Sequence, residues 1–168
     1  MAGRVLVAYA SKSGTTAEVA EAIAEALRAQ KLSVDTLPVD SVAGLSEYSA
    51  VVLGSGVRIG KWLPQALAFA RKHQSALATL PVAIFTVHML AVGADEESRQ
   101  HREAYTAAVR DIVRPRAEAF FAGRIEMSRL SLVERLMTKA VKAPEADDRD
   151  WTAIRQWSEG LPEKLGLR

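Results

Sequence analysis

The chemistry-bearing residues nearest the N-terminus form a short polar run between an apolar stretch and a helical pattern. The run reads Ser11-Lys12-Ser13-Gly14-Thr15-Thr16. A helix N-terminus presents backbone N–H groups without intrahelical acceptors, together with the positive end of the helix dipole. Hydroxyl groups beside those N–H groups, and a glycine that allows close backbone approach, form a pocket that suits a phosphate group. An N-cap needs one hydroxyl and this run has four, which favours a phosphate site over a plain cap.

Two later polar stretches are further candidates for a binding edge. Ser55–Lys61 and His88–Gly93 each follow an apolar run of strand type. Starting at Gly54, the glycines have the spacing G-x-G-x-x-x-G, which is one residue too long for the dinucleotide fingerprint. Trp62 stands where a P-loop has Ser or Thr. The sequence therefore disfavours NAD and ATP sites of these two types.

The remaining titratable and nucleophilic side chains form no catalytic constellation, so the catalytic residues stay unassigned. His73, His88 and His101 lack the spacing of metal ligands, and no metal site is predicted. The serines lack a nucleophile elbow. His88 has two interpretations, a proton donor beside a bound cofactor or a structural side chain, and both stay open.

The apolar patterns alternate between strand and helix along the whole chain. The expected strands are Arg4–Ala10, Leu32–Leu37, Ala50–Gly54, Val82–Val87 and Ala119–Ile125. The expected helices are Thr16–Ala29, Leu63–Ala78, Asp95–Val113, Leu130–Lys142 and Asp150–Leu165. This alternation predicts an α/β fold with a doubly wound parallel sheet covered on both faces. Ligands of such sheets bind at the carboxyl ends of the strands, where we expect the three polar stretches to meet.

The overall composition is that of one globular domain covering residues 1–168. Hydrophobic residues make up 49% of the 168 residues and charged residues 25%. The absence of cysteine excludes disulfides and thiolate chemistry. The net charge is +2 without a basic stripe interleaved with aromatic residues, so no nucleic-acid partner is expected. Neither a targeting peptide nor an apolar run of about 18 residues is seen, which favours a cytoplasmic protein.

The motif Ser11-x-Ser13-Gly14-x-Thr16 after the first strand resembles the FMN phosphate loop of flavodoxins, and the similarity extends over nearly the whole chain. Val51–Lys61 and Phe85–Leu90 look like the flavin loops of one branch, the menaquinone-dependent protoporphyrinogen IX dehydrogenases. That branch also has an extra segment before the last helix, which corresponds to about 126–149 here. The segment in the branch carries aromatic residues, whereas 122–150 here has none, a departure that concerns the substrate more than the flavin.

The resemblance implies a sheet of five parallel strands in the order 2-1-3-4-5, with FMN bound by three loops. The backbone of the second and third loops would flank the isoalloxazine ring. The residues that the resemblance assigns to the cofactor are Ser11, Lys12, Ser13, Gly14, Thr15, Thr16, Ser55, Gly56, Val57, Arg58, Ile59, Gly60, Lys61, Thr86, Val87, His88, Met89 and Leu90.

The implied activity is two-electron oxidation of protoporphyrinogen IX with a quinone as acceptor. No Asp or Glu occurs between Ser55 and Ala94, and cationic surroundings favour the anionic, fully reduced flavin. One alternative is an electron-transfer flavodoxin without a substrate of its own, although such carriers are usually acidic. A second alternative is a flavin-free interaction module that uses the loop for another anion.

The extra segment contains a basic amphipathic pattern over Ser128–Lys142. Such a helix suits an anionic membrane, as peripheral contact at the inner face, or a lipophilic substrate. The alternative, which the absence of Trp and Phe from its apolar face favours over deep membrane insertion, is packing on its own domain or on a second copy, as a homodimer. Elsewhere we expect Phe85 in the core, Trp62 as the first core residue of the helix that follows, and Trp151 on the inner face of the last helix.

Overall fold

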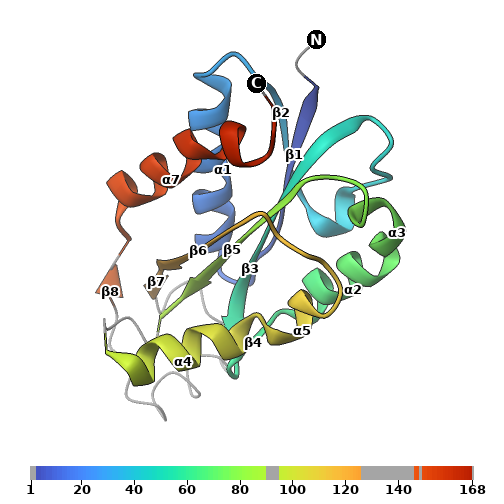
Figure 1. The fold of residues 1–168 in the computed structure, drawn as a ribbon. Coiled ribbons are helices and arrows are strands. Elements are labelled where there is room, and N and C mark those ends of the chain that lie inside the picture. Colours follow the sequence, from blue (N-terminus) through green and yellow to red (C-terminus); the bar gives the residue numbers. More distant parts are fainter. Residues whose placement is uncertain (1–2, 90–94, 126–145, 148, 168) are drawn as a thin grey trace.

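A computed structural model of the chain describes residues 3–89, 95–125, 146–147 and 149–167. A twisted parallel sheet forms the centre of the molecule (Figure 1). Its strands lie in the order β2-β1-β3-β5-β6. Their bounds are β1 Arg4–Ala10, β2 Ser33–Pro38, β3 Tyr48–Arg58, β5 Val82–His88 and β6 Ala117–Ala122. A two-residue strand, β4 (Lys61–Trp62), pairs antiparallel with β3. Without β4 the order is 2-1-3-4-5, and the predicted fold class is confirmed.

Helices cover both faces of the sheet. One face packs against α1 (Thr15–Arg28) and α7 (Trp151–Lys164), which lie side by side in Figure 1. The opposite face packs against a short 3-10 turn and several helices. These are Val39–Ser41, α2 (Pro64–Lys72), α3 (Gln74–Leu77) and α5 (Ala107–Arg110), with α4 (Glu96–Tyr105) beside them. Because the helices cover both faces, the loops that follow the carboxyl ends of β1, β3 and β5 lie at one edge of the sheet.

The residue types explain these elements. The residues from Val5 to Ala8 are fully buried, and every residue of β5 is buried, which is why the central strands read as continuous apolar runs. Helix α1 buries Val19, Ile23 and Leu27 at helical spacing. Asp150 caps α7 by accepting a hydrogen bond of 2.9 Å from the Ala153 N–H.

Two segments that were predicted as single helices each form two helices in the structure. The helix expected over Leu63–Ala78 is interrupted at His73, and the one expected over Asp95–Val113 is interrupted at Thr106. Both residues have φ near −105°, outside the helical range. The chain therefore turns within each segment, although neither interruption occurs at Pro or Gly.

The strand expected over Ala119–Ile125 is also two pieces. It ends as β6 at Ala122 and resumes after Gly123 as β7 (Arg124–Ile125), which pairs antiparallel with β8 (Ala146–Asp147).

Trp151 is 42% exposed, so its expected place on the inner face is wrong. The helix expected over Leu130–Lys142, and with it most of the extra segment 126–149, lies outside the described residues. Within the described ranges, no helix has the length and apolarity to cross a membrane.

Gly54 occupies a position in β3 where a side chain does not fit. It pairs with Phe85 of β5, and a Cβ atom at Gly54 would lie 1.9 Å from the Phe85 Cζ. Phe85 is fully buried, as predicted, so its ring has no free space to move into.

We expect Gly54→Ala to lower the free energy of unfolding by about 1–3 kcal/mol, because overpacking forces the ring and backbone to shift. Gly44→Ala is the matched control, since a Cβ there would have no heavy atom within 4 Å. Urea unfolding of the apoprotein measures both changes. Equal stability of the two variants would contradict the close approach at Gly54.

Candidate functional site

The loop between β1 and α1 is held by its own residues. Gly14 is the N-cap of α1 and has a left-handed conformation with φ of 89°. The Gly14 N–H donates a hydrogen bond of 3.0 Å to the Ser11 Oγ, and the Glu18 N–H donates to the Gly14 carbonyl oxygen at 3.1 Å. A glycine N-cap has no hydroxyl to offer, so the plain Ser/Thr cap is not what the structure shows. The N–H groups of the first turn face the loop instead.

The two threonines that begin α1 lie at the meeting point of several strands. Thr15 and Thr16 are 5% and 3% exposed. A Cβ atom at Gly56, near the end of β3, would lie 3.1 Å from the Thr16 Oγ1. A Cβ atom at Gly123, just after β6, would lie 3.3 Å from the Thr15 Cγ2. The absence of side chains at these glycines lets the neighbouring strands approach the start of α1.

The second predicted loop, Ser55–Lys61, is a β-hairpin rather than an irregular loop. Strand β3 continues to Arg58, and β4 returns from Lys61. The turn consists of Ile59 and Gly60, with φ of 53° and 69°. Two positive φ values are typical of a type I′ hairpin turn.

Buried polar groups fix the base of this hairpin. The Ser55 Oγ accepts a hydrogen bond of 3.0 Å from the Leu63 N–H and donates one of 2.7 Å to the Gly56 carbonyl oxygen. The Trp62 Nε1–H donates a hydrogen bond of 2.9 Å to the Thr86 Oγ1. This last bond joins the second predicted loop to the third. Trp62 is buried as expected but belongs to β4, and α2 begins at Pro64.

The third predicted loop is largely the end of β5. Its residues Thr86 and His88 are 0% and 4% exposed, and Leu90 lies outside the described residues. The His88 ring lies between aromatic rings, with centroid distances of 5.8 Å to Tyr105 and 6.2 Å to Phe120. Burial raises the pKa of the Tyr105 hydroxyl, which therefore remains a neutral phenol. These surroundings favour the structural interpretation of His88.

Two residues of the site were missed by sequence reasoning. Gly123 is one, and its N–H donates a hydrogen bond of 2.9 Å to the His88 carbonyl oxygen. Arg149 is the other: its side chain is 6% exposed and forms an ion pair with Glu18 in the first turn of α1. The Arg149 guanidinium also lies over the Trp151 ring, 4.7 Å from its centroid. The sequence offered a signal for Gly123, because a glycine in a strand pattern indicates a bulge or a close backbone approach. It offered no signal for Arg149, because its partner Glu18 lies far away in the sequence.

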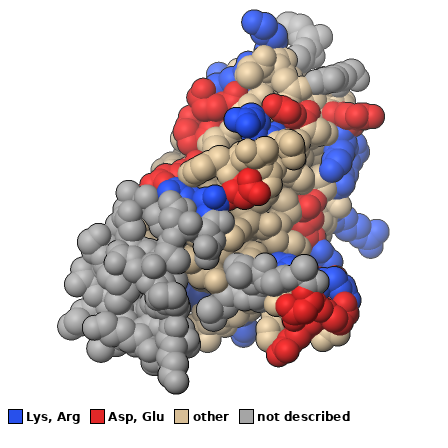
Figure 2. All heavy atoms as spheres, turned by 90° about the vertical axis from the view of Figure 1, so that its left-hand side faces the viewer, with Lys and Arg blue, Asp and Glu red and all other residues tan. Residues whose placement is uncertain are grey.

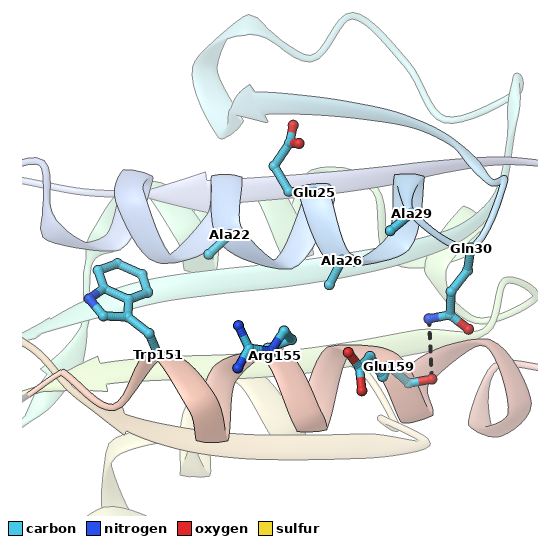
Figure 3. Close-up of a pocket in the computed structure, with 8 residues that line it drawn as sticks. All are labelled: Ala22, Glu25, Ala26, Ala29, Gln30, Trp151, Arg155 and Glu159. Atoms are coloured by element: carbon cyan, nitrogen blue, oxygen red, sulfur yellow. Dashed lines mark hydrogen bonds between the residues drawn. The ribbon is translucent and has the colours of Figure 1, made fainter.

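A separate hollow lies between α1 and α7 (Figure 3). Ala22 and Ala26 of α1 form one side together with Ala29 just after the helix, and Trp151 and Arg155 of α7 form the other. It runs beside the C-terminal half of α1, so it is distinct from the loops at the start of that helix. Figure 2, which views the left-hand side of Figure 1, shows acidic and basic side chains interspersed rather than a patch of one sign.

Comparisons with known proteins agree with this architecture. A family model described as a flavodoxin domain matches residues 6–152. The protoporphyrinogen IX dehydrogenase (quinone) of Escherichia coli K12 is 24% identical over 162 residues, covering 93% of this chain and 90% of that protein. The protein of the same name from Leishmania major is 25% identical over 170 residues, covering 92% of this chain and 73% of that protein.

Solved structures show the same fold. A short-chain flavodoxin associated with a bacterial microcompartment superposes with a TM-score of 0.60 at 15% identity, covering 97% of this chain and 99% of that one. A Streptococcus pneumoniae flavodoxin has a TM-score of 0.58 at 15% identity, covering 97% of this chain and 100% of that one.

We expect the Trp62–Thr86 hydrogen bond to stabilise the site. Thr86→Val should lower the free energy of unfolding by about 1–3 kcal/mol, because it leaves a buried indole N–H without its acceptor. A double-mutant cycle with Trp62→Phe, followed by urea unfolding, isolates the bond from the packing changes. Additive single effects would show that the two side chains do not interact.

Proposed function

Because the chain belongs to the flavodoxin domain family, whose cofactor is FMN, we propose that it is an FMN-dependent oxidoreductase that oxidises protoporphyrinogen IX in two-electron steps. Each step removes two electrons and two protons from the substrate and converts one quinone into a quinol. FMN, when bound, supplies the hydride-accepting chemistry. The chain's own residues bind it, orient it and set the charge around it.

The observation that carries the proposal is the cradle at the start of α1. Gly14 turns the loop in the left-handed conformation, and the buried residues Thr15 and Thr16 begin α1, where the first-turn N–H groups lack intrahelical acceptors. Gly56 leaves space next to Thr16. This donor set fits a phosphate group, and we assign the FMN phosphate to residues 11–16.

The isoalloxazine ring is assigned to the stretches 55–61 and 86–90. Backbone groups there would hold the ring, and Gly56 and Gly60 permit close approach. Arg58 and Lys61 lie in the first stretch, and the sequence places no carboxylate between Ser55 and Ala94. Positive charge favours the anionic, fully reduced flavin, which suits two-electron oxidation.

The relatives' names support the choice of substrate and acceptor. Two of them are named as quinone-dependent protoporphyrinogen IX dehydrogenases. Where the quinone is drawn from a bilayer, we propose that the basic pattern over 128–142 provides contact with the inner membrane surface of a cytoplasmic enzyme. The same segment is also our candidate for homodimer contact.

An electron-transfer flavodoxin is the second candidate, since the structural relatives above are described as flavodoxins. The net charge of +2 argues against it, because such carriers dock through acidic surfaces.

Replacing hydroxyls of the phosphate loop should weaken FMN binding. We expect Thr16→Val and Ser13→Ala each to raise the FMN dissociation constant at least about tenfold, because a hydrogen bond to a charged group contributes about 1.5–3 kcal/mol. Quenching of FMN fluorescence on titration with apoprotein measures this. Thr152→Val, an exposed threonine of α7, is the control and should leave the affinity unchanged. Unchanged affinity in the loop variants would contradict the phosphate assignment.

Stepwise anaerobic reduction separates the enzyme from the carrier. We expect the visible flavin bands of the purified holoprotein to bleach in a single two-electron phase, and the protein to oxidise protoporphyrinogen IX when a menaquinone analogue is present. A persistent one-electron-reduced form without porphyrinogen turnover would support the carrier. If the protein binds no flavin at any FMN concentration, the result would contradict the oxidoreductase and support the flavin-free interaction module.

A further inference from the structure

We propose that Arg149 is a positioning residue for the FMN phosphate. Its guanidinium neutralises the charge of Glu18 in the first turn of α1, so that a phosphate group can bind at this helix start without repulsion. The inference rests on the proposed function, because it takes residues 11–16 as the phosphate site. It adds to the cofactor site a side chain that lies outside the three predicted loops.

Glu18 places a negative charge beside the proposed phosphate site. It is the acidic residue of the first turn of α1, and its N–H donates a hydrogen bond of 3.1 Å to the carbonyl oxygen of Gly14. A carboxylate in this turn stabilises the helix through its dipole. A phosphate group carries a charge of about −1.5 to −2 at pH 7, so the same carboxylate repels it. Without compensation, Glu18 would weaken the anion site that the helix start provides.

Arg149 supplies the compensating charge from a distant part of the chain. Its Nη1–H donates a hydrogen bond to the Glu18 Oε2, although the two residues lie 131 positions apart in the sequence. The Arg149 side chain is 6% exposed and that of Glu18 is 36% exposed. Salt screens a partly buried ion pair much less than a pair on the open surface. The neutralisation of Glu18 therefore persists at ordinary ionic strength.

The residues that follow Arg149 hold it in this position. Its guanidinium carbon lies 4.7 Å from the centroid of the Trp151 ring, which is a cation–π arrangement. Between these two residues, Asp150 fixes the start of α7 by accepting the hydrogen bond from the Ala153 N–H. The exposed Trp151 ring thus orients the arginine instead of filling the core.

The docking of α7 on α1 does not by itself account for the ion pair. The two helices lie side by side (Figure 1), and Val19, Ile154 and Leu161 are fully buried in one hydrophobic cluster. At the other end of α1, the Gln30 Nε2 donates a hydrogen bond of 3.3 Å to the Glu159 carbonyl oxygen. A buried ion pair often stabilises a fold no more than apolar residues in its place. Compensation of charge at the phosphate site explains why the pair lies at this end.

The test compares FMN with riboflavin, which lacks the phosphate, by quenching of flavin fluorescence on titration with apoprotein. We expect Arg149→Gln to raise the FMN dissociation constant at least about tenfold and that of riboflavin less than about twofold, because Glu18 then keeps its charge beside the phosphate. Adding Glu18→Gln should restore FMN affinity to within about threefold of the unmodified protein. Arg155→Gln removes an exposed positive charge of α7 and is the matched control, which should change neither affinity.

Glu18→Gln alone is a second test that does not depend on how well Arg149→Gln folds. The helix start then keeps the cation without the carboxylate. This variant should bind FMN at least as tightly as the unmodified protein, and weaker binding would overturn the proposal.

Three other results would also overturn it. These are unchanged FMN affinity in Arg149→Gln, an equal loss of FMN and riboflavin affinity, or no recovery in the double variant. An equal loss would assign Arg149 to helix docking alone. Failure of the proposed function looks different: FMN affinity would follow the expected pattern across the variants, but the unmodified holoprotein would not oxidise protoporphyrinogen IX.

Discussion

The burial of both faces of the parallel sheet determines where this protein can bind anything through polar groups. Helices cover the apolar side chains of β1, β3 and β5 on each side, so the strands carry almost no polar residues until they end. The hydroxyls, glycines and cations therefore collect at the carboxyl edge. Close approach at that edge depends on small residues, because Gly56 and Gly123 leave room for the two threonines that begin α1.

The sequence predicts the parts of this arrangement that depend on local pattern. The bounds of β1 agree residue for residue with the expected strand, and α1 differs by one residue at each end. The interruptions at His73 and Thr106 were missed because the helical pattern continues through them without Pro or Gly. The hairpin was missed because Ile59–Gly60 lacks the usual Asn-Gly or Asp-Gly signal.

Contacts between distant segments explain the remaining differences. Periodicity places Trp151 on the same face as Ile154, but it cannot show that Ile154 is fully buried while Trp151 is 42% exposed. Arg149 likewise has no local pattern, because its role depends on α1. Glu18 favours the N-terminus of α1 through the helix dipole but would repel a phosphate bound there. Its ion pair with Arg149 neutralises that charge, so the helix start keeps its acidic residue and remains suited to an anion.

The fixed base of the β3–β4 hairpin explains why backbone strain can persist at its tip, where Ile59 has a φ of 53°. A free loop would relax Ile59 out of its left-handed conformation. Here the Ser55 hydrogen bonds, the buried Trp62 ring and the Trp62–Thr86 bond fix the base of the hairpin only a few residues away. Two strands held in register over so short a distance leave a two-residue turn little conformational choice. The buried polar groups beneath the tip thus determine how its exposed side chains are presented.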